Sequence, residues 1–384
     1  MILGIIKESD RDEKRVALVP EVIPQVTKAG FKVLLERGAG EEAGFADQSY
    51  SARGVDVVTR EEVLQQSDII ASIRVLGRDP TRWKTESVLI KEGLIFIGLA
   101  DPYNSEELLR ELSLKKATLF ALELLPRITR AQSMDVLSSM ATVAGYKAVL
   151  LAAAELPRMF PMFITAAGTV NPAKVFVVGA GVAGLQAIAT ARRLGAVVSA
   201  YDVRPAVKQE VESLGARFIE MGLESQDAQT AGGYARAMDE SFYQRQRELM
   251  SDAVSSANVV ISTAAVPGKR APILITREMV EKMEPGSVIV DLAAAMGGNC
   301  ELTQPDHKVI HNGVTILGPT NLPATVPYHA SYMFAKNISA FIRNLINKEG
   351  KLDLDQDDPI ITETLVLRDG KMVHGALKEH WKWS

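Results

Sequence analysis

Residues 173–204 read AKVFVVGAGVAGLQAIATARRLGAVVSAYDVR, and this stretch decides the fold of the chain around it. An apolar run over Val175–Val178 leads into glycines spaced Gly-x-Gly-x-x-Gly, and the segment Val182–Leu194 that follows has the composition of a helix. A second apolar run, Val197–Tyr201, ends on an aspartate. Strand, tight glycine turn, helix, strand and acidic residue follow one another in the order of a dinucleotide-binding βαβ unit. The stretch therefore predicts a nucleotide site.

The residue types of this motif each have a physical reason. Gly179 permits the sharp turn, Gly181 lets the backbone approach a pyrophosphate, and Gly184 lets the helix pack closely on the strand. The pyrophosphate is expected at the helix N-terminus, where N–H groups and the helix dipole favour an anion. Asp202 should accept hydrogen bonds from the adenosine ribose and repel a 2′-phosphate, which favours NAD(H) over NADP(H), although an arginine such as Arg204 can accommodate that phosphate. The predicted cofactor-binding residues of this stretch are Gly179, Gly181, Val182, Gly184, Asp202, Val203 and Arg204.

Length and composition limit the classes of protein to consider. A chain of 384 residues should form about two domains, and 47% apolar with 23% charged residues is ordinary for a globular protein. The net charge of −4, without any run of Lys or Arg, predicts no nucleic-acid binding. The one cysteine, Cys300, excludes an internal disulfide and fits a reducing cytoplasm. The longest apolar region, Val143–Leu156, is interrupted by charged residues, so no membrane span is predicted.

Short β-branched runs alternate with helical stretches over residues 1–125 and again after the glycine motif. Such alternation predicts parallel sheets flanked by helices. Long helical patterns over Asp135–Phe160 and His329–Asn347 are predicted to join two domains. The expected fold is therefore α/β, with two Rossmann-like domains that have parallel sheets, joined by two long helices with an interdomain cleft. The expected boundaries are 1–135 plus 328–384 for a discontinuous first domain and 136–327 for the NAD(H)-binding domain.

A polar segment, PRITRAQSMDVLSS at residues 126–139, lies between the first predicted sheet and the first long helix. It is expected to face the interdomain cleft, and clefts between domains are favoured ligand sites. Arg127 offers a fork for a carbonyl or phosphate oxygen, Gln132 an amide, and Asp135 an acceptor. The alternative is that Ser133 or Asp135 caps the helix and that the arginines are solvated. The residues alone leave both interpretations open.

A second polar segment, Gly222–Asp239, falls inside the second domain and carries Gly233 and Tyr234. A long loop inside a compact domain is uncommon and is often functional. A lid over a bound ligand and a plain surface loop both remain open.

No histidine lies in the segments where catalytic residues would be expected. All five follow residue 306, none lies in the glycine motif or in residues 126–139, and no HExxH or CxxC motif predicts a metal site. A dehydrogenase that acts on an alcohol or amine usually needs an acid–base group, because a proton moves with the hydride. Hydride transfer between two nicotinamide rings moves no such proton and requires chiefly that the rings meet at roughly 3–3.5 Å. The sequence favours this second chemistry.

Several segments together carry a resemblance to a known family. They are KRVALVPE at 14–21, PRITRAQSMDVLSSMATVAGYKAV at 126–149, ITAAGTVNPAKVFVVGAGVAGLQAIATARRLGA at 164–196, TAGGYARAM at 230–238 and PGSVIVDLAAAMGGNC at 285–300. Over essentially its whole length the chain resembles the NAD(H)-binding component of proton-translocating nicotinamide nucleotide transhydrogenases. The same superfamily includes the alanine dehydrogenases.

The resemblance implies roles for particular residues and for partners. Arg127, Gln132, Asp135 and Ser138 would contact the nicotinamide end of NAD(H) and orient it during transfer, and Gly233 and Tyr234 would belong to a lid. The chain would form a homodimer, peripheral at the cytoplasmic face of the inner membrane, and dock on an NADP(H)-binding component with membrane-spanning subunits. Hydride would pass between NAD(H) bound here and NADP(H) on that partner, coupled to proton translocation.

An alanine dehydrogenase is the alternative within the superfamily. Those enzymes have a substrate lysine after the strand equivalent to Asp68–Ile73, where this chain has Arg74. They have a catalytic histidine in the region of Ile97–Ala100 and an aspartate in the stretch matching Asp291–Ala295, where this chain has an alanine. These departures agree with the missing acid–base chemistry, although Arg74 could supply the charge of the lysine. A non-enzymatic NAD-sensing module is a further alternative.

Overall fold

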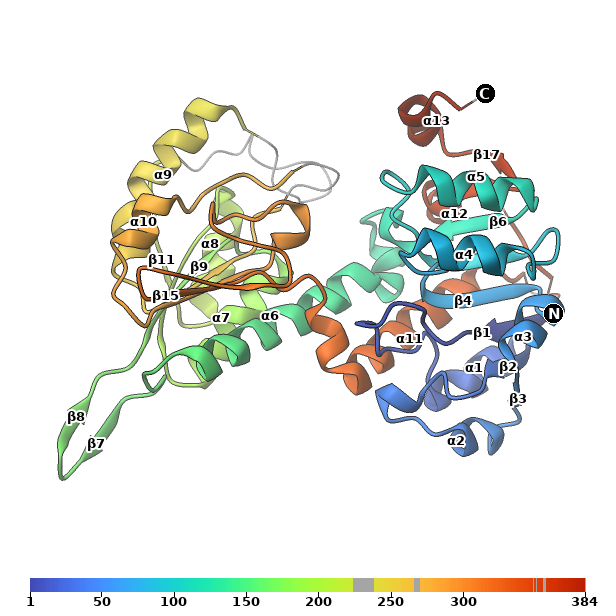
Figure 1. The fold of residues 1–384 in the computed structure, drawn as a ribbon, viewed down its shortest axis with the longest axis horizontal. Helices are drawn as coiled ribbons and strands as arrows, with labels where there is room; N and C mark the ends of the chain where they lie inside the picture. The colour runs from blue at the N-terminus through green and yellow to red at the C-terminus, as the bar shows by residue number, and fades with distance from the viewer. Residues whose placement is uncertain (224–237, 266–269, 348, 350, 355–356, 384) are drawn as a thin grey trace. The chain divides into compact units, whose positions relative to one another are not determined.

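The computed structural model describes the whole chain except residues 224–237, 266–269, 348, 350, 355–356 and 384. The chain divides into two compact units, Met1–Met140 with Pro323–Ser384 (unit 1) and Ala141–Leu322 (unit 2). Each unit is built on a mostly parallel sheet with helices packed on it (Figure 1). The predicted α/β class with two parallel sheets is confirmed.

The sheet of unit 1 has the strand order β17-β16-β6-β5-β4-β1-β2-β3. Strands β1 to β6 are parallel, and β16 and β17 extend the sheet antiparallel as a hairpin. The bounds of the strands are β1 Ile2–Ile5, β2 Lys32–Glu36, β3 Asp56–Val58, β4 Ile69–Arg74, β5 Ile95–Leu99, β6 Thr118–Ala121, β16 Leu365–Arg368 and β17 Lys371–Met372. The order 3-2-1-4-5-6 is that of a Rossmann sheet, whose topological switch point lies between β1 and β4.

The helices of unit 1 follow local sequence signals. Thr59 and Glu62 form a reciprocal capping box at the start of α3, and α5 buries its leucine face. In the β16–β17 turn, Asp369 and Gly370 both have positive φ, as the Asp-Gly signal predicts. The bounds are α1 Ile23–Lys28, α2 Asp47–Ser51, α3 Arg60–Gln66, α4 Pro80–Ser87, α5 Glu106–Leu114, α11 Pro327–Asn344, α12 Pro359–Thr364 and α13 Gly375–Trp381.

The sheet of unit 2 has the order β11-β10-β9-β12-β13-β15-β14, parallel except for the edge strand β14. The bounds of its strands are β9 Lys174–Val178, β10 Val197–Tyr201, β11 Arg217–Phe218, β12 Val259–Ser262, β13 Val288–Asp291, β14 Lys308–His311 and β15 Val314–Leu317. The bounds of its helices are α7 Val182–Arg193, α8 Lys208–Ser213, α9 Glu240–Ser255 and α10 Arg277–Glu281. Here the switch point lies between β9 and β12, which are neighbours in the sheet.

Helix α6 (Val136–Glu155) begins in unit 1 and continues into unit 2. Among the described residues it is the helix whose length and apolar composition would suffice to cross a membrane, a test that core helices of soluble proteins also pass. Its residues Ala148, Val149 and Ala152 are fully buried in the core of unit 2. The second long helix, α11, lies entirely in unit 1.

Side chains alternate across the unit 2 sheet, as strands buried on both faces require. Along β9, Val175 and Val177 join the core beneath α6, α7 and α8, whereas Phe176 and Val178 join the core beneath α9 and α10. A separate hairpin, β7 (Phe163–Thr165) with β8 (Gly168–Val170), projects from unit 2 (Figure 1). This hairpin was not predicted from the sequence, and neither were the strands β3 and β14 or the helices α2, α4, α8, α9, α10, α12 and α13.

Candidate functional site

The glycine turn joins β9 to α7 at the carboxyl edge of the unit 2 sheet. Gly179 has a φ of +93°, and a Cβ there would lie 2.8 Å from Oγ1 of Thr263. A Cβ on Gly184 would lie 1.9 Å from the carbonyl oxygen of Gly179, so only glycine allows α7 this close to the turn. Nothing lies within 4 Å of the position a Cβ would take on Gly181. Packing therefore explains Gly179 and Gly184, and the open space at Gly181 is what the close approach of a phosphate would use.

The N-terminus of α7 is suited to an anion. Gly181 is the N-cap residue and supplies no side-chain cap, while its carbonyl accepts the first helical hydrogen bond, from the N–H of Leu185 at 2.8 Å. Val182, the first helical residue, is half-buried. Arg192 and Arg193 lie in the last turn, where cations complement the helix dipole.

Asp202 follows β10 and is almost completely buried. Its carboxylate accepts the N–H of Ala180 in the glycine turn at 2.7 Å, which ties the end of β10 to that turn. It also accepts the backbone N–H of Arg204 and two guanidinium N–H groups, Nε at 2.8 Å and Nη2 at 2.7 Å. Hydrogen bonding to Asp202 raises the pKa of Arg204 above its ordinary value. The guanidinium group of Arg204 is therefore already paired with the carboxylate of Asp202.

The segment before α6 belongs to unit 1. Asp135 accepts the N–H of Ser138 at 2.9 Å and its hydroxyl at 2.5 Å, so the capping arrangement considered for Asp135 is the one observed. Arg127 and Gln132 are exposed. Arg130 pairs with Asp358 rather than being simply solvated. Gly233 and Tyr234, which were predicted to belong to a lid, lie outside the described residues.

Sequence reasoning missed residues that hold the turn from a distance. Thr263, after β12, donates its hydroxyl to the carbonyl oxygen of Gly179 at 3.0 Å. A Cβ on Gly145 of α6 would lie 2.1 Å from the carbonyl oxygen of Ala183, so this glycine permits α6 to pack against the first turn of α7. Both contacts join residues far apart in the sequence, and no local pattern predicts them.

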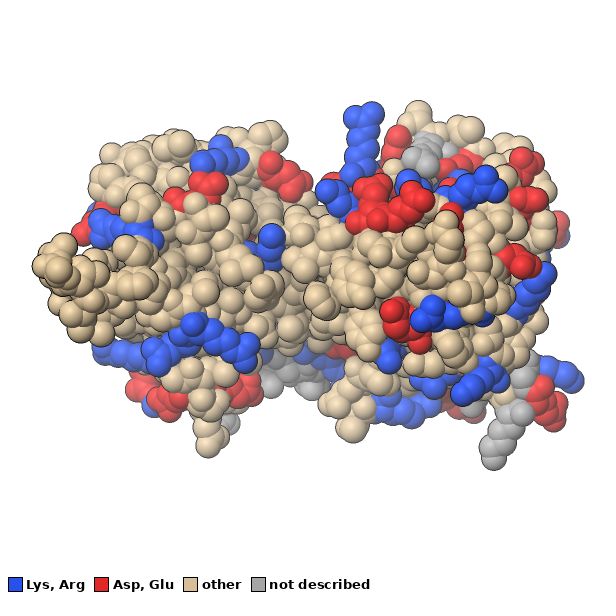
Figure 2. Space-filling model, turned by 90° about the horizontal axis from the view of Figure 1, so that it is seen from below, with Lys and Arg blue, Asp and Glu red and all other residues tan. Residues whose placement is uncertain are grey.

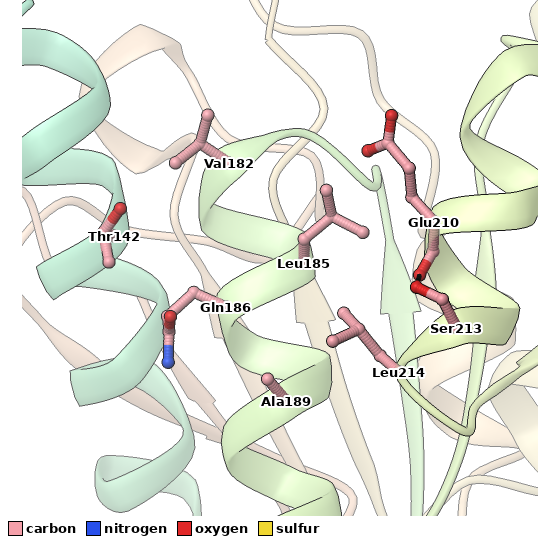
Figure 3. Close-up of a pocket in the computed structure, with 8 residues that line it drawn as sticks. All are labelled: Thr142, Val182, Leu185, Gln186, Ala189, Glu210, Ser213 and Leu214. Atoms are coloured by element: carbon pink, nitrogen blue, oxygen red, sulfur yellow. Dashed lines mark hydrogen bonds between the residues drawn. The ribbon is translucent and has the colours of Figure 1, made fainter.

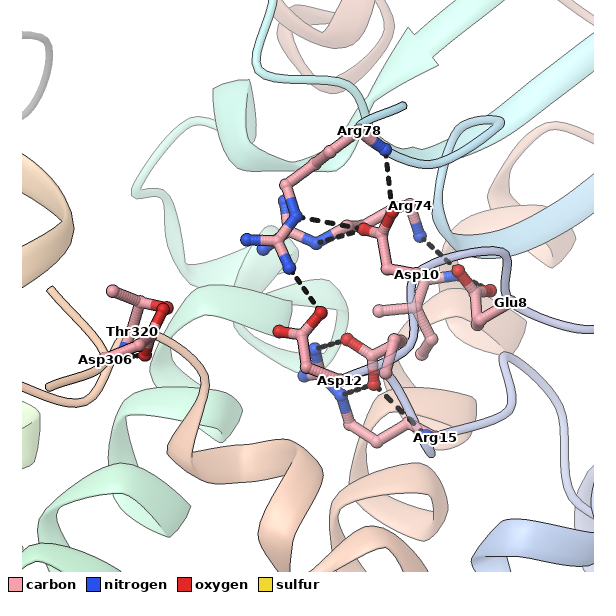
Figure 4. A network of polar contacts seen from close by, with 10 residues as sticks. Glu8, Asp10, Asp12, Arg15, Arg74, Arg78, Asp306 and Thr320 are labelled. Atoms are coloured by element: carbon pink, nitrogen blue, oxygen red, sulfur yellow. Dashed lines mark hydrogen bonds and ion pairs between the residues drawn. The ribbon is translucent and has the colours of Figure 1, made fainter. Parts of the chain in front are cut away.

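At the switch point of unit 1, charged residues occupy the carboxyl ends of β1 and β4 (Figure 4). Glu8 accepts the N–H groups of Ile73 and Arg74 at 2.6 and 3.1 Å. It is buried, and burial, together with the nearby carboxylate of Glu13, raises its pKa to about 8. Nε of Arg74 lies 3.7 Å from Oδ2 of Asp10, so the charge of Arg74 is balanced within unit 1.

The other guanidinium groups of this cluster are bound in the same way (Figure 4). Arg78 donates to Asp10 at 3.0 Å and to Asp12 at 2.5 Å. The buried pair of Arg15 and Glu13 is bidentate, with contacts of 2.7 and 2.5 Å. Glu8 and these carboxylates thus fill the place at which a Rossmann sheet presents its ligand site.

A hollow of about 380 Å³ lies on unit 2 and is lined by α6, α7 and α8 (Figure 3). Leu185 and Leu214 give it an apolar wall, and Thr142 and Gln186 line its opposite side. Val182, the first residue of α7 and one of the predicted cofactor-binding residues, also lines the hollow. The hollow therefore begins beside the predicted nucleotide site and extends along α7, and the glycines of the turn do not line it.

Other classes of site find no positive support. Among the described residues, no group of three or more His, Cys, Asp or Glu is arranged to hold a metal ion. On the face seen in Figure 2, basic and acidic side chains are interspersed rather than gathered into one basic field. All five histidines contact other residues of the chain: His307 contacts the carbonyl oxygen of Pro305, His311 pairs with Glu281, His329 packs on Tyr328, His374 accepts the N–H of Leu377, and His380 packs on Tyr103.

These features define a class. A Rossmann sheet with a glycine turn, an uncapped helix N-terminus and an acidic residue after the second strand is the site of a dinucleotide-binding protein. Family comparisons agree: the model "Alanine dehydrogenase/PNT, N-terminal domain" matches residues 4–144, and the corresponding C-terminal domain model matches residues 148–375. The chain belongs to the alanine dehydrogenase/PNT family.

Relatives within the family differ in how similar they are to this chain. The first part of the NAD(P) transhydrogenase subunit alpha of Rhodospirillum rubrum is 46% identical over 382 residues, covering 98% of this chain and 99% of that protein. A crystal structure of transhydrogenase from Sinorhizobium meliloti is 42% identical with a TM-score of 0.86, covering 97% of this chain and 100% of that one. The alanine dehydrogenase of Methanococcus maripaludis is 28% identical, covering 98% of this chain and 95% of that enzyme. The sequence identity is thus higher to the transhydrogenase alpha subunit than to the alanine dehydrogenase.

Proposed function

We propose that this chain is the NAD(H)-binding component of a proton-translocating NAD(P) transhydrogenase. Hydride would pass between NAD(H) held in unit 2 and NADP(H) held by a partner component. The observation that carries the proposal is the glycine turn, where Asp202 closes on the N–H of Ala180 beside an uncapped helix N-terminus. The similarity to transhydrogenase alpha subunits over nearly the whole chain supports the particular reaction.

The turn accounts for nucleotide binding. The pyrophosphate would lie against Gly181 and Val182, where the dipole of α7 favours an anion. The adenosine ribose would lie at Asp202 and Val203. Arg204 is bidentate on Asp202, so its charge is balanced, and a 2′-phosphate would have to compete with a carboxylate for it. This pair supports a preference for NAD(H) over NADP(H).

The chemistry would need orientation more than acid–base catalysis. Bound NAD(H) supplies a hydride at the nicotinamide ring, and direct passage to a second nicotinamide ring involves no proton donor. In this proposal, Arg127, Gln132, Asp135 and Ser138 contact the nicotinamide end of NAD(H) and orient it during transfer. The cap formed by Asp135 and Ser138 fixes the geometry of that segment before it meets a ligand. Arg74, which stands where alanine dehydrogenases have a substrate lysine, is balanced by Asp10.

The proposed assembly is a homodimer, peripheral at the cytoplasmic face of the membrane, that docks on an NADP(H)-binding component and membrane-spanning subunits. The β7–β8 hairpin supports self-association. All its strand residues are exposed, including Phe163, Val170 and Ile164, which is 76% exposed. An isolated two-stranded hairpin is marginal in water, so an apolar one is expected to be covered by another chain.

Reconstitution tests the proposal. Purified chain would be titrated with NADH by calorimetry and then mixed with an NADP(H)-loaded partner component, with transfer followed optically using an oxidised NAD analogue. Tight NADH binding and transfer that requires both proteins are the expected results. NADH binding without transfer, together with NADH oxidation by pyruvate and ammonium, would replace the proposal with an alanine dehydrogenase. Binding without either reaction would favour a sensing module.

A further inference from the structure

Asn299 has all its hydrogen-bonding groups engaged and is completely buried. Its side-chain oxygen accepts the N–H of Ala264 at 2.9 Å, and its amide nitrogen donates to the carbonyl oxygens of Ala264 at 2.8 Å and Pro272 at 2.9 Å. Its backbone oxygen accepts the N–H groups of Leu274 and Ile275. One side chain therefore holds both polar groups of Ala264, as a neighbouring strand would.

Asn299 is itself held by a buried carboxylate at the end of β13. Its backbone N–H donates to Oδ2 of Asp291 at 2.7 Å, and Gly297 and Gly298, both with positive φ, wrap the chain around that carboxylate. Asp291 is fully buried, and further donors satisfy it completely: they are the hydroxyls of Ser262 and Thr303 and the N–H groups of Ala293 and Cys300. The Cys300 thiol is buried beside it. The carboxylate of Asp291, which holds Asn299, is therefore fixed in position by these hydrogen bonds.

Ala264 in turn lies against the glycine turn. A Cβ on Gly179 would lie 3.2 Å from the nitrogen of Ala264, and Thr263 bonds the carbonyl oxygen of Gly179. Thr263 also continues the ladder, donating its N–H to Val178 at 2.8 Å. A chain of hydrogen bonds thus runs from Asp291 through Asn299 and Thr263–Ala264 to the turn. It crosses the switch point between β9 and β12, where Rossmann sheets bind their ligands.

We propose that Asn299 is a positioning residue for NAD(H), which fixes the backbone of Thr263 and Ala264, directly after β12, as one wall of the nucleotide site. The inference rests on the proposed NAD(H) site. Because Asn299 takes both polar groups of Ala264, this residue needs no water to satisfy it, and its N–H is not a free donor toward the nucleotide. The glycine turn, through its hydrogen bond with Thr263, then determines the position of this wall, which does not vary with the ligand.

The substitution Asn299→Asp tests the role with almost no change in shape. A carboxylate can still accept the N–H of Ala264 but cannot donate to the carbonyl oxygens of Ala264 and Pro272, so two buried acceptors lose their donor. We expect NADH affinity to fall by about tenfold to a hundredfold in a calorimetric titration. The matched control is Asn258→Asp. Asn258 accepts the N–H of Lys174 at 2.9 Å at the amino end of the same strands, away from the turn.

The pH dependence separates positioning from general destabilisation. The carboxyl introduced by Asn299→Asp would be buried beside carbonyl oxygens, which raises its pKa, and once protonated it can donate one of the missing hydrogen bonds. The affinity defect should therefore shrink as the pH is lowered, whereas the wild type and Asn258→Asp should not share this recovery. A lower melting temperature in both variants, combined with an unchanged NADH affinity of Asn299→Asp, would overturn the inference.

A milder variant covers the case in which Asn299→Asp does not fold. Thr263→Val keeps the shape and removes only the hydroxyl bond to Gly179, and we expect it to weaken NADH by about three- to tenfold with an unchanged fold. Unchanged affinity would overturn the inference. If the wild type itself binds no NADH, the proposed function fails first and the positioning role fails with it, whereas wild-type binding with unaffected variants refutes only the positioning role.

Discussion

Substituting alanine for Gly184 tests why the helix starts where it does. The added Cβ would lie 1.9 Å from the carbonyl oxygen of Gly179 and 2.9 Å from its carbon, and neither is a side-chain atom that can rotate away. Ordinary contact begins at 3.4 Å, so the helix and the turn must separate by about 1.5 Å. Forcing atoms into a packed site of this kind typically costs about 1–3 kcal/mol. For a domain of this size, the melting temperature should fall by roughly 2–12 °C.

The same displacement should also weaken the nucleotide, because it moves the N–H groups of α7 away from the turn that faces the pyrophosphate. Calorimetric titration with NADH and thermal melting of the same preparation measure both effects. The matched control is Gly181→Ala. Nothing lies within 4 Å of its added Cβ and its φ is −77°, so the melting temperature should hardly move.

Gly181→Ala should nevertheless lower NADH affinity by about tenfold or more, since its methyl group takes the space reserved for the pyrophosphate. The pair of variants therefore separates packing from binding. A Gly184→Ala protein that melts and binds NADH like the wild type would refute the close-approach argument. Full affinity in Gly181→Ala would refute the placement of the pyrophosphate.

Three further predictions concern single side chains. Gln132→Asn should slow hydride transfer by about tenfold with little change in NADH affinity, because its proposed role is to orient the ring; equal losses in both measurements would remove that role. Asp202→Ala should weaken NADH by about tenfold and improve NADPH binding, because it removes the ribose acceptor and releases Arg204, and parallel titrations with both nucleotides check this. Glu8 has a folded-state pKa of about 8 against an ordinary 4.5, so its contribution to stability is complete below about pH 4.5 and is lost as the pH rises through 8. Melting temperatures should therefore fall between pH 5 and 9 in the wild type and less steeply in Glu8→Gln, and parallel slopes would contradict this account.

The part of the fold that the sequence predicts well is local. The β9–α7–β10 unit depends on glycines, a periodic pattern of apolar residues and an aspartate within one continuous stretch. The residues that form it can therefore be recognised in the sequence. The β16–β17 hairpin is similar, because the Asp369-Gly370 pair favours the positive φ that its turn requires, although Ser113 and Ala117 also hydrogen-bond Gly370. In both cases neighbouring residues favour the backbone conformation that forms.

The elements that escaped prediction depend on partners far along the chain. Helix α2 is five residues long, and the hydroxyl of its buried Tyr50 donates to the carbonyl oxygen of Leu18 at 2.9 Å. Strand β14, which contains His311, alternates between exposed and half-buried residues at a sheet edge, so its sequence carries little hydrophobic signal. Such short elements exist because tertiary contacts override weak local preference.

The candidate site divides in the same way. The sequence predicts that Asp202 is an acceptor, but not that it already holds Ala180 and Arg204. The sequence around Asp135 is compatible with both a cap and a ligand role, and only a folded backbone could show that the cap forms. The role of the Asn299 side chain has no local signature, because its side-chain partners lie 27 and 35 residues away.

The burial of Cys300 has a practical consequence for spectroscopy. It is the chain's one cysteine, it is 1% exposed, and burial raises its pKa to about 11, so almost no thiolate exists near neutral pH. Maleimides and nitroxide reagents should leave it unmodified. A cysteine introduced at an exposed position outside the β7–β8 hairpin, such as Leu114, would then be the single reactive thiol. Site-specific labels for distance measurements between chains can therefore be attached to the natural sequence without first replacing its own cysteine.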